Sequence, residues 1–385
     1  MTLPTIDPGF STDVMTALFG AGTRVAMMCR VEAALARASA DVGILGDDVA
    51  GRIATACGEG VEDPEAVLVE GWVAGTPVLP LLDRLRDRLD DEAARWLHHG
   101  ATTQDVVDTG LVLQVSDALE VLGDDLAALV GRLRDLAVAQ RTTPTTGWTF
   151  LQPAVPTTVG RRVAGWLAPV VEALAAVRAA RRGLRVQLGG PTGTLDVLGE
   201  DGPAVHDRMA ELLGLVAPPA PWHADRSPVH DVVAVLSRLT RTVATIGTDL
   251  ALLARDGTAR MRAGGSSSMP DKRNPIDAIR AVAAAEACAG GAATVLHGRA
   301  IELERGVGGW HAETFAVPLV VQTAGAAVEA LSAAVASLEL DGDLPDADVA
   351  PGAVAFTDRV VAACDAALGG SAGGGSTAGA EEPAR

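Results

Sequence analysis

The sequence predicts an all-α protein built as a bundle of long helices. Apolar residues make up 48 % of the 385 residues, yet only 3 % are aromatic and tyrosine is absent. The apolar residues are mostly Ala, Val and Leu, which suit closely packed helices. They also recur at steps of three and four over long stretches, which is the spacing of one face of an α-helix.

A heptad pattern in the middle of the chain predicts the first long helix, of roughly eight turns. Its apolar positions are Val115, Leu119, Leu122, Leu126, Leu129, Leu133 and Leu136. A second helix is predicted by the apolar positions Val163, Trp166, Val170, Leu174 and Val177. A third is predicted by Val232, Val235, Leu239, Val243, Ile246, Leu250 and Leu253. A fourth is expected to begin near Pro275 and to carry Ile276, Ile279 and Val282 before an Ala-rich stretch.

These helices suggest a division of the chain into four parts. Residues 1–108 are expected to form an N-terminal helical domain, 109–333 the central long-helix bundle, and 334–368 a reduced C-terminal helical region. Residues 369–385 are rich in Gly, Ser and Ala and are predicted to be a disordered tail. Bundles of this kind often extend across subunits, so a homo-oligomer is expected. Periodicity alone leaves open a helical scaffold without chemistry.

The net charge of −18 disfavours nucleic acid and acidic membrane surfaces as partners. No basic segment followed by an apolar core opens the chain, and no uninterrupted apolar run approaches the ~20 residues of a membrane span. We therefore expect no membrane partner and a cytoplasmic location. Four widely spaced cysteines without CxxC spacing indicate buried structural thiols and no metal site: Cys29, Cys57, Cys288 and Cys364.

The segment 264–275 reads Gly-Gly-Ser-Ser-Ser-Met-Pro-Asp-Lys-Arg-Asn-Pro. It is a flexible loop that ends in two cations and an amide just before a predicted helix start. Backbone N–H groups, hydroxyls and the helix dipole would together favour an anion there. A hydroxyl on such a loop can be carried to a substrate carbon when the loop closes. A bare Gly/Ser run is more often a plain linker, so the prediction depends on the complete string.

The complete string resembles the signature G-S-S-x-M-P-x-K-x-N of the fumarase/aspartase superfamily. Residues 98–105 resemble a second motif of that superfamily, H-x-G-x-T-S-x-D, with Thr103 in place of serine. A plainer interpretation of Asp105 is that it caps the following helix. Near the N-terminus, Arg24 and residues 32–35, which begin with Glu32, fit the family pattern and are expected to serve in helix packing. Residues 147–154 lie where other members carry T-H-x-Q-P-A, with Phe150 at the position of the histidine. Trp148 stands where the family usually has arginine.

Phe150 points to one branch of the superfamily, because phenylalanine cannot transfer a proton to a leaving group. The chain is most similar to the 3-carboxy-cis,cis-muconate cycloisomerases, where an aromatic residue is common at this place. Residues 221–226 and 304–313 also resemble their P-W-H-x-x-R and E-R…W-H-A-E runs. Two alternatives remain open: another lyase of the superfamily, such as an adenylosuccinate lyase-like enzyme, and a non-catalytic helical paralogue.

The resemblance implies an intramolecular lyase that converts 3-carboxy-cis,cis-muconate to a carboxymuconolactone in protocatechuate breakdown by the β-ketoadipate route. It also implies a fumarase/aspartase-type bundle that assembles into a homotetramer with shared active sites, without metal or organic cofactor. Ser266 would transfer the proton, and His98 is the second implied catalytic residue. The implied contacts of the small tricarboxylate substrate are Thr102, Thr103, Gln104, Gln152, Ser267, Met269, Lys272, Asn274 and Arg305.

Overall fold

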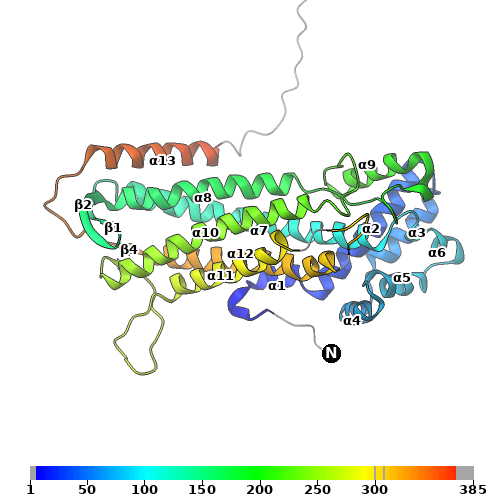
Figure 1. Cartoon of the computed structure of the whole chain (residues 1–385), viewed down its shortest axis with the longest axis horizontal. Coiled ribbons are helices and arrows are strands. Elements are labelled where there is room, and N and C mark those ends of the chain that lie inside the picture. The colour runs from blue at the N-terminus through cyan, green and yellow to red at the C-terminus, as the bar shows by residue number, and fades with distance from the viewer. Residues whose placement is uncertain (1–5, 299–300, 307, 370–385) are drawn as a thin grey trace, which may run out of the picture. The chain divides into compact units, whose positions relative to one another are not determined.

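The computed structural model describes residues 6–298, 301–306 and 308–369. It confirms the all-α class, since 68 % of the chain is helical (Figure 1). The elements are η1 Pro8–Phe10, α1 Asp13–Leu18, α2 Ala21–Asp41, α3 Asp47–Gly58, α4 Pro64–Ala74, α5 Val78–Arg86, α6 Asp91–Trp96, α7 Thr103–Ala139, β1 Pro144–Thr149, β2 Gln152–Thr158, α8 Val159–Arg182, η2 Asp196–Asp201, α9 Gly202–Leu213, α10 Ser227–Arg255, β3 Ala259–Arg260, α11 Ile276–Leu296, α12 Gly309–Ala336, β4 Glu339–Leu340 and α13 Pro351–Gly369.

The first three predicted helices are present as α7, α8 and α10. In α7 the predicted seam is buried from Val115 to Leu133, and Leu136 at its end is half-buried. All five predicted apolar positions of α8 are buried. In α10 six of the seven are buried, while Val235 is half-buried. A heptad of Leu and Val therefore identified both the helix and its core face.

The fourth predicted helix is present as α11, in which Ile276, Ile279 and Val282 precede the predicted Ala-rich stretch. Ile276 and Ile279 are exposed within the chain, and Val282 is only half-buried. The buried face instead carries small residues, among them Ala278, Ala281, Ala284, Ala285, Cys288, Gly291 and Ala292. Small side chains allow a close approach of helix backbones, as at Gly291, where an added Cβ would lie 3.0 Å from the side chain of Val320 in α12.

The long helix α12 was not anticipated from the sequence. It contains Pro318 in its interior and is apolar around most of its circumference, so it lacks the polar stripe that would reveal a helical period. Residues such as Ala316, Val320, Val321 and Ala324 are fully buried. A helix surrounded by protein on all sides needs no polar face, which explains the missing signal.

The chain divides into two compact units, each described here by itself. Unit 1 comprises Met1–Asp124, Ala176–Thr248 and Ile276–Leu331, and unit 2 comprises Asp125–Ala175, Asp249–Pro275 and Ser332–Arg385. The long helices α7, α8, α10 and α12 contribute residues to both. The four-part division expected from the sequence remains a prediction. Of its tail, Gly369 ends α13 and residues 370–385 lie outside the described residues.

Unit 1 contains a large apolar core around α2. This helix packs on α3 and α9, and its buried side chains include Val25, Met28, Val31 and Leu35. In unit 2 the strands β1 and β2 form an antiparallel hairpin. The carboxylate of Asp343 accepts hydrogen bonds from the Thr146 N–H (2.7 Å) and from both the Thr145 and Thr146 hydroxyls, which fixes the base of the hairpin.

Three helices, α8, α11 and α12, are long and apolar enough to cross a membrane by length and composition alone. In the most apolar windows of α8 and α11, 44 % and 39 % of the residues are buried inside the chain, against 72 % in α12. The expectation of no membrane partner therefore remains a prediction. The lower burial of α8 and α11 leaves apolar side chains of these two helices exposed in the single chain.

Candidate active site

The sequence-predicted site residues fall into two groups that belong to different units. His98, Thr102, Thr103, Gln104 and Arg305 lie in unit 1. The loop 264–275 and Gln152 lie in unit 2. The structure therefore defines the geometry within each group, and each group is described separately.

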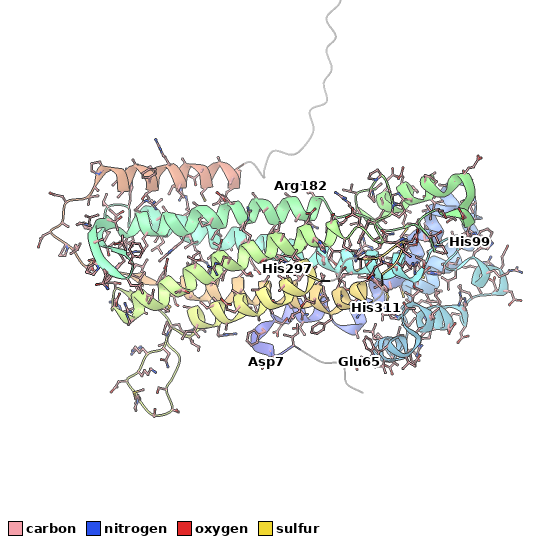
Figure 2. The ribbon with its side chains drawn as sticks, viewed as in Figure 1. Asp7, Glu65, His99, Arg182, His297 and His311 are labelled. Atoms are coloured by element: carbon pink, nitrogen blue, oxygen red, sulfur yellow. The ribbon has the colours of Figure 1, made fainter. Side chains whose placement is uncertain are left out.

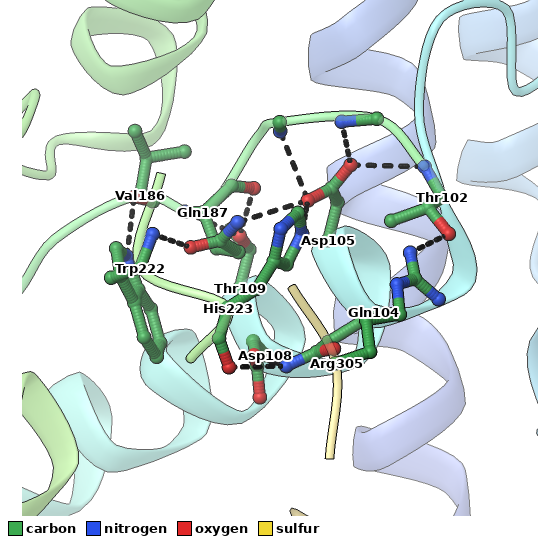
Figure 3. Close-up of polar contacts among 12 residues, drawn as sticks. Thr102, Gln104, Asp105, Asp108, Thr109, Val186, Gln187, Trp222, His223 and Arg305 are labelled. Carbon is green, nitrogen blue, oxygen red and sulfur yellow. Dashed lines mark hydrogen bonds and ion pairs between the residues drawn. The ribbon is translucent and has the colours of Figure 1, made fainter. Parts of the chain in front are cut away.

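The carboxylate of Asp105 organises the first group (Figure 3). It accepts five hydrogen bonds while fully buried. The donors are the backbone N–H groups of Thr102, Gly189 and Gly190, the side-chain amide of Gln187, and the Nε2 of His223, which lies 2.6 Å away. Asp105 thus caps the first turn of α7, as the sequence suggested, and also ties two distant chain segments to it.

Glycine is required where the backbone passes this carboxylate. Gly189 packs so closely that an added Cβ would lie 2.7 Å from Pro221 and 2.8 Å from His223. Gly100, in the turn that leads into α7, has φ +84°, and an added Cβ would lie 2.5 Å from the side chain of Leu198. Both glycines therefore allow the segments around Asp105 to approach one another.

Thr102 and Arg305 are in direct contact: an N–H of the Arg305 guanidinium donates to the Thr102 hydroxyl (Figure 3). The Nε of Arg305 is buried and has no hydrogen-bond partner among the described residues. A guanidinium with an unused donor suits a carboxylate ligand, because its fork can bind two oxygens. Thr103 begins α7 and is half-buried.

Gln104 is held inside the protein. Its Nε2 donates to a carboxylate oxygen of Asp108 and to the carbonyl of His223, both at 3.1 Å. Both amide protons are therefore used by protein acceptors, and only the amide oxygen remains for a ligand. A contact between Gln104 and substrate stays a prediction.

Gln104 contacts a buried network of charged residues through Asp108. Arg226 makes two hydrogen bonds to the carboxylate of Asp108, at 2.7 and 2.9 Å, and pairs with Glu313 at 2.7 Å. The indole N–H of Trp310 also donates to Asp108 (2.8 Å). Burial by itself would lower the pKa of Arg226, but Asp108 and Glu313 outweigh it and raise the pKa above its ordinary value. The network joins α7, α10 and α12 within unit 1.

His98 lies just before this region with a left-handed backbone, φ +65°. Its Nδ1 is 2.7 Å from the Oε1 of Glu32 in α2. Burial alone would lower the pKa of His98, but the charge and hydrogen bond of Glu32, with a contribution from Asp105, raise it. The imidazolium form of the predicted catalytic histidine is therefore more favoured than in an exposed histidine.

The Gly/Ser loop of unit 2 forms an open lobe whose side chains project outward (Figure 2). Its base is closed by hydrogen bonds between Gly264 and Asn274, and the Asn274 amide donates to the Gly265 carbonyl (3.3 Å). The Ser266 hydroxyl accepts the Met269 N–H at 3.1 Å. The side chains of the predicted ligands Ser267, Met269 and Lys272 are exposed.

The composition of the chain marks this loop in a way that the motif analysis missed. Lys272 is the only lysine in the 385 residues, and Asn274 is the only asparagine. All other basic side chains, histidine apart, are arginines. A chain that elsewhere does without lysine and asparagine carries both at two signature positions for which a contact with the substrate is predicted.

Gln152 lies at the tip of the β1–β2 hairpin. The two residues before it, Phe150 and Leu151, have φ +50° and +58°, which forms a tight turn of non-glycine residues. The side chain of Phe150 is fully exposed, and Leu151 and Val155 are largely exposed. The amide of Gln152 donates to the Leu151 carbonyl (3.1 Å). The tip of the hairpin is thus apolar and exposed in the part of the chain that the structure describes.

Among the described residues no three His, Cys, Asp or Glu side chains are grouped to hold a metal ion. The four cysteines are buried and unpaired. Burial, with the nearby charge of Glu32, raises the pKa of the Cys29 thiol to about 11, so it is a poor nucleophile at neutral pH.

Several residues of the site were not identified from the sequence. Asp108, Thr109 and Gln187 carry no motif of their own, and Glu32 seemed to be a helix-packing residue. A buried polar residue in an apolar helical stretch was the available signal, as with Asp105, Asp108 and Thr109 inside the start of α7. Most of their partners come from residues 78 to 202 positions away, which periodicity does not report.

Comparison with known proteins identifies the family to which this chain is similar. A family model described as Lyase matches residues 10–290. A 3-carboxy-cis,cis-muconate cycloisomerase from Pseudomonas aeruginosa is 37 % identical over 84 % of this chain and 73 % of its own length. A nitrosuccinate lyase from Streptomyces davaonensis is 32 % identical over 90 % of this chain and 77 % of its own.

Solved structures agree. The crystal structure of the 3-carboxy-cis,cis-muconate lactonizing enzyme from Pseudomonas putida superimposes with a TM-score of 0.81 at 31 % identity, over 93 % of this chain and 79 % of that one. The family match, the identity to full-length relatives and the shared helical fold lead to one conclusion. The chain belongs to the lyase family and is a member of the fumarase/aspartase superfamily.

Proposed function

We propose that this chain is a 3-carboxy-cis,cis-muconate cycloisomerase. One observation carries the proposal beyond the family: the sole lysine and the sole asparagine lie in the signature loop, while Phe150 replaces the histidine that other members use on a leaving group. Intramolecular addition of a carboxylate has no separate leaving group, so it can dispense with that histidine. A helical scaffold protein would have no need for Lys272 and Asn274.

In the proposed reaction one carboxylate oxygen of the substrate forms a bond to a carbon of the conjugated double bond. The electron pair of that double bond moves onto the carbon next to another carboxylate, which then carries two negative charges as an aci-carboxylate. Ser266 donates its hydroxyl proton to this carbon and is reprotonated from solvent. No atom leaves the substrate, so substrate and lactone are isomers.

The residues of the two groups would supply the charge that this intermediate needs. The Met269 N–H at 3.1 Å from Ser266 Oγ stabilises the alkoxide that remains after proton transfer. Lys272 and Arg305 would hold carboxylates, while Thr102, Thr103, Gln104, Gln152, Ser267, Met269 and Asn274 would complete the binding surface. Fixed donors and cations act most strongly when closure of the loop excludes water.

We further propose that the site is completed in a cytoplasmic homotetramer, where different copies contribute the two groups. The exposed apolar tip of the hairpin supports this, because a fully exposed phenylalanine in a left-handed turn is unfavourable unless another surface covers it. Phe150→Asp should therefore reduce the mass measured by light scattering from four chains toward smaller species. A tetramer that is unaffected by this change would contradict the assignment of the hairpin to an interface.

The activity is tested by adding the purified protein to freshly generated 3-carboxy-cis,cis-muconate and following the ultraviolet absorbance of the conjugated diene. Loss of the absorbance, with a lactone identified by NMR, supports the proposal. Parallel incubation with adenylosuccinate tests the alternative function, that of an adenylosuccinate lyase-like enzyme. Turnover of adenylosuccinate without turnover of the muconate would overturn the cycloisomerase assignment.

A further inference from the structure

Glu32 and His98 form a buried pair whose geometry has a consequence for the site. The side chain of Glu32 is 0 % exposed and that of His98 is 15 % exposed. Glu32 Oε1 lies 2.7 Å from His98 Nδ1, so this ring nitrogen carries the proton that is shared with the carboxylate. Nε2 is the only ring nitrogen that remains for a ligand.

The carboxylate of Glu32 depends on this ring for compensation. Its second oxygen, Oε2, is buried and has no hydrogen-bond partner among the described residues. The negative charge of Glu32 contributes to raising the pKa values of the Cys29 and Cys57 thiols. A buried carboxylate in these surroundings is stable only beside a positive charge. The imidazolium form of His98 supplies that charge.

The other charged groups around the ring support the same protonation state. Asp105 in α7 favours the imidazolium, while Arg86 in α5 opposes it. Burial also opposes it, but the pair with Glu32 prevails and the pKa of His98 is raised. His98 is therefore charged over a wider pH range than an exposed histidine, whose pKa is near 6.5.

We propose that Glu32 is a positioning residue that holds His98 as a fixed imidazolium, with Nε2–H directed to a substrate carboxylate. The inference rests on the proposed function. It deepens that function by assigning His98, the second implied catalytic residue, to bind a substrate carboxylate as a cation. Three carboxylates in the substrate then meet three cations, namely His98, Lys272 and Arg305. A neutral His98 would leave one carboxylate with a weaker partner.

Glu32→Gln tests this directly, because glutamine keeps the size and the hydrogen-bond acceptor but removes the charge. We expect the pKa of His98, measured by NMR titration of its ring, to fall by about one unit or more. The basic limb of the kcat/KM profile should move to lower pH by the same amount, and KM should rise more than kcat falls. A merely structural role of Glu32 would change stability without moving this limb.

The matched control is Asp207→Asn, which removes a carboxylate 3.0 Å from the Nδ1 of His206 outside the site. It should leave the pH profile unchanged. His98→Gln alone and the double variant Glu32→Gln/His98→Gln complete a cycle, in which the second change should add little to the loss in kcat/KM. Additive losses in folded variants, or an unmoved basic limb in Glu32→Gln, would overturn the inference.

A binding experiment separates this inference from the proposed reaction. Propane-1,2,3-tricarboxylate serves as the probe, with its Kd measured by calorimetry across pH in the wild type and in Glu32→Gln. As pH rises, the loss of binding should begin at a lower pH in Glu32→Gln than in the wild type, in step with the His98 titration. That result supports the inference even if 3-carboxy-cis,cis-muconate is not turned over. In that case only the proposed function fails. A Kd with the same pH dependence in both proteins would overturn it.

Discussion

The Asp105–Asp108 region and the loop 264–275 differ in how completely their polar groups are used. Asp105 accepts five hydrogen bonds, and Asp108 accepts from Arg226, Gln104 and Trp310, all in a buried setting. In the loop, Ser266 has one backbone partner and Lys272 is exposed. One region is fixed by its own contacts, whereas the other keeps its reactive groups available.

In the proposed function this difference corresponds to different roles for the two regions. A network in which every member has a partner resists rearrangement, because each lost contact leaves a buried polar group unsatisfied. A lobe held only at its base by Gly264 and Asn274 can change position at small cost. In that proposal the first region orients the substrate, and the loop delivers a proton to it.

Breaking the buried network should have the largest effect on stability. Arg226→Met leaves Asp108 and Glu313 buried without their counter-charge, which should cost about 3–5 kcal/mol in the free energy of unfolding. Urea denaturation measures this. The control Arg208→Met removes an exposed arginine paired with Asp41 and Glu211, and it should leave the denaturation midpoint nearly unchanged. Equal losses of stability in Arg226→Met and Arg208→Met would contradict the greater importance of the buried network.

Gly100→Ala should have the next largest effect. It adds a Cβ 2.5 Å from the Leu198 side chain at φ +84°, so strain and overpacking together should cost about 2–4 kcal/mol. Gly193→Ala is the matched control, since its φ of +80° is similar but nothing lies within 4 Å of the added atom. Thermal denaturation of both variants separates the two causes. If Gly193→Ala is equally destabilised, packing against Leu198 is not responsible.

The loop should behave in the opposite way, with a loss of activity and little loss of stability. Lys272→Ala should raise KM by roughly 10- to 100-fold, because one charged hydrogen bond to a substrate carboxylate is removed, while the denaturation midpoint stays within error. Lys272→Arg, which keeps the charge but changes its shape, is the informative control. A stability loss as large as that of Arg226→Met would show that the loop is part of the folded core.

The pH dependence of stability gives the smallest predicted effect. Because the pKa of His98 is raised in the folded protein, its pair with Glu32 contributes stability fully below the unfolded pKa near 6.5. That contribution is lost as pH rises through the folded pKa. Comparing the free energy of unfolding of the wild type and His98→Gln between pH 6 and pH 9 measures it. A difference that grows with rising pH would contradict the assigned protonation state.

The sequence predicted those parts of the fold in which a single helix face is apolar. α7, α8 and α10 each have such a face, and each was found with its core side. α12 was missed because it is apolar around most of its circumference. The core face of α11 was not identified, because its small residues pack inward while Ile276 and Ile279 do not. Residue size at a contact is decided by the neighbouring helix, which a local period does not record.

For the site, motifs identified the residues but not their partners. Asp105 was expected to cap a helix and does so, but its bonds to Gly189, Gly190 and His223 come from segments far along the chain. Glu32 resembled a packing residue because nothing near it in the sequence reveals a histidine 66 positions away. Pairs of buried charges that lie far apart in the sequence can be recognised only from the folded structure.

The measurement that tests the central claim most directly is the rate of diene loss from 3-carboxy-cis,cis-muconate in the wild type and in Ser266→Ala, with Ser268→Ala of the same loop as the control. The account predicts turnover by the wild type, a loss of at least about 100-fold in kcat for Ser266→Ala, and nearly unchanged activity for Ser268→Ala, all at equal stability. An active Ser266→Ala variant would contradict the role of this serine, and a folded wild-type tetramer without turnover would contradict the assigned substrate.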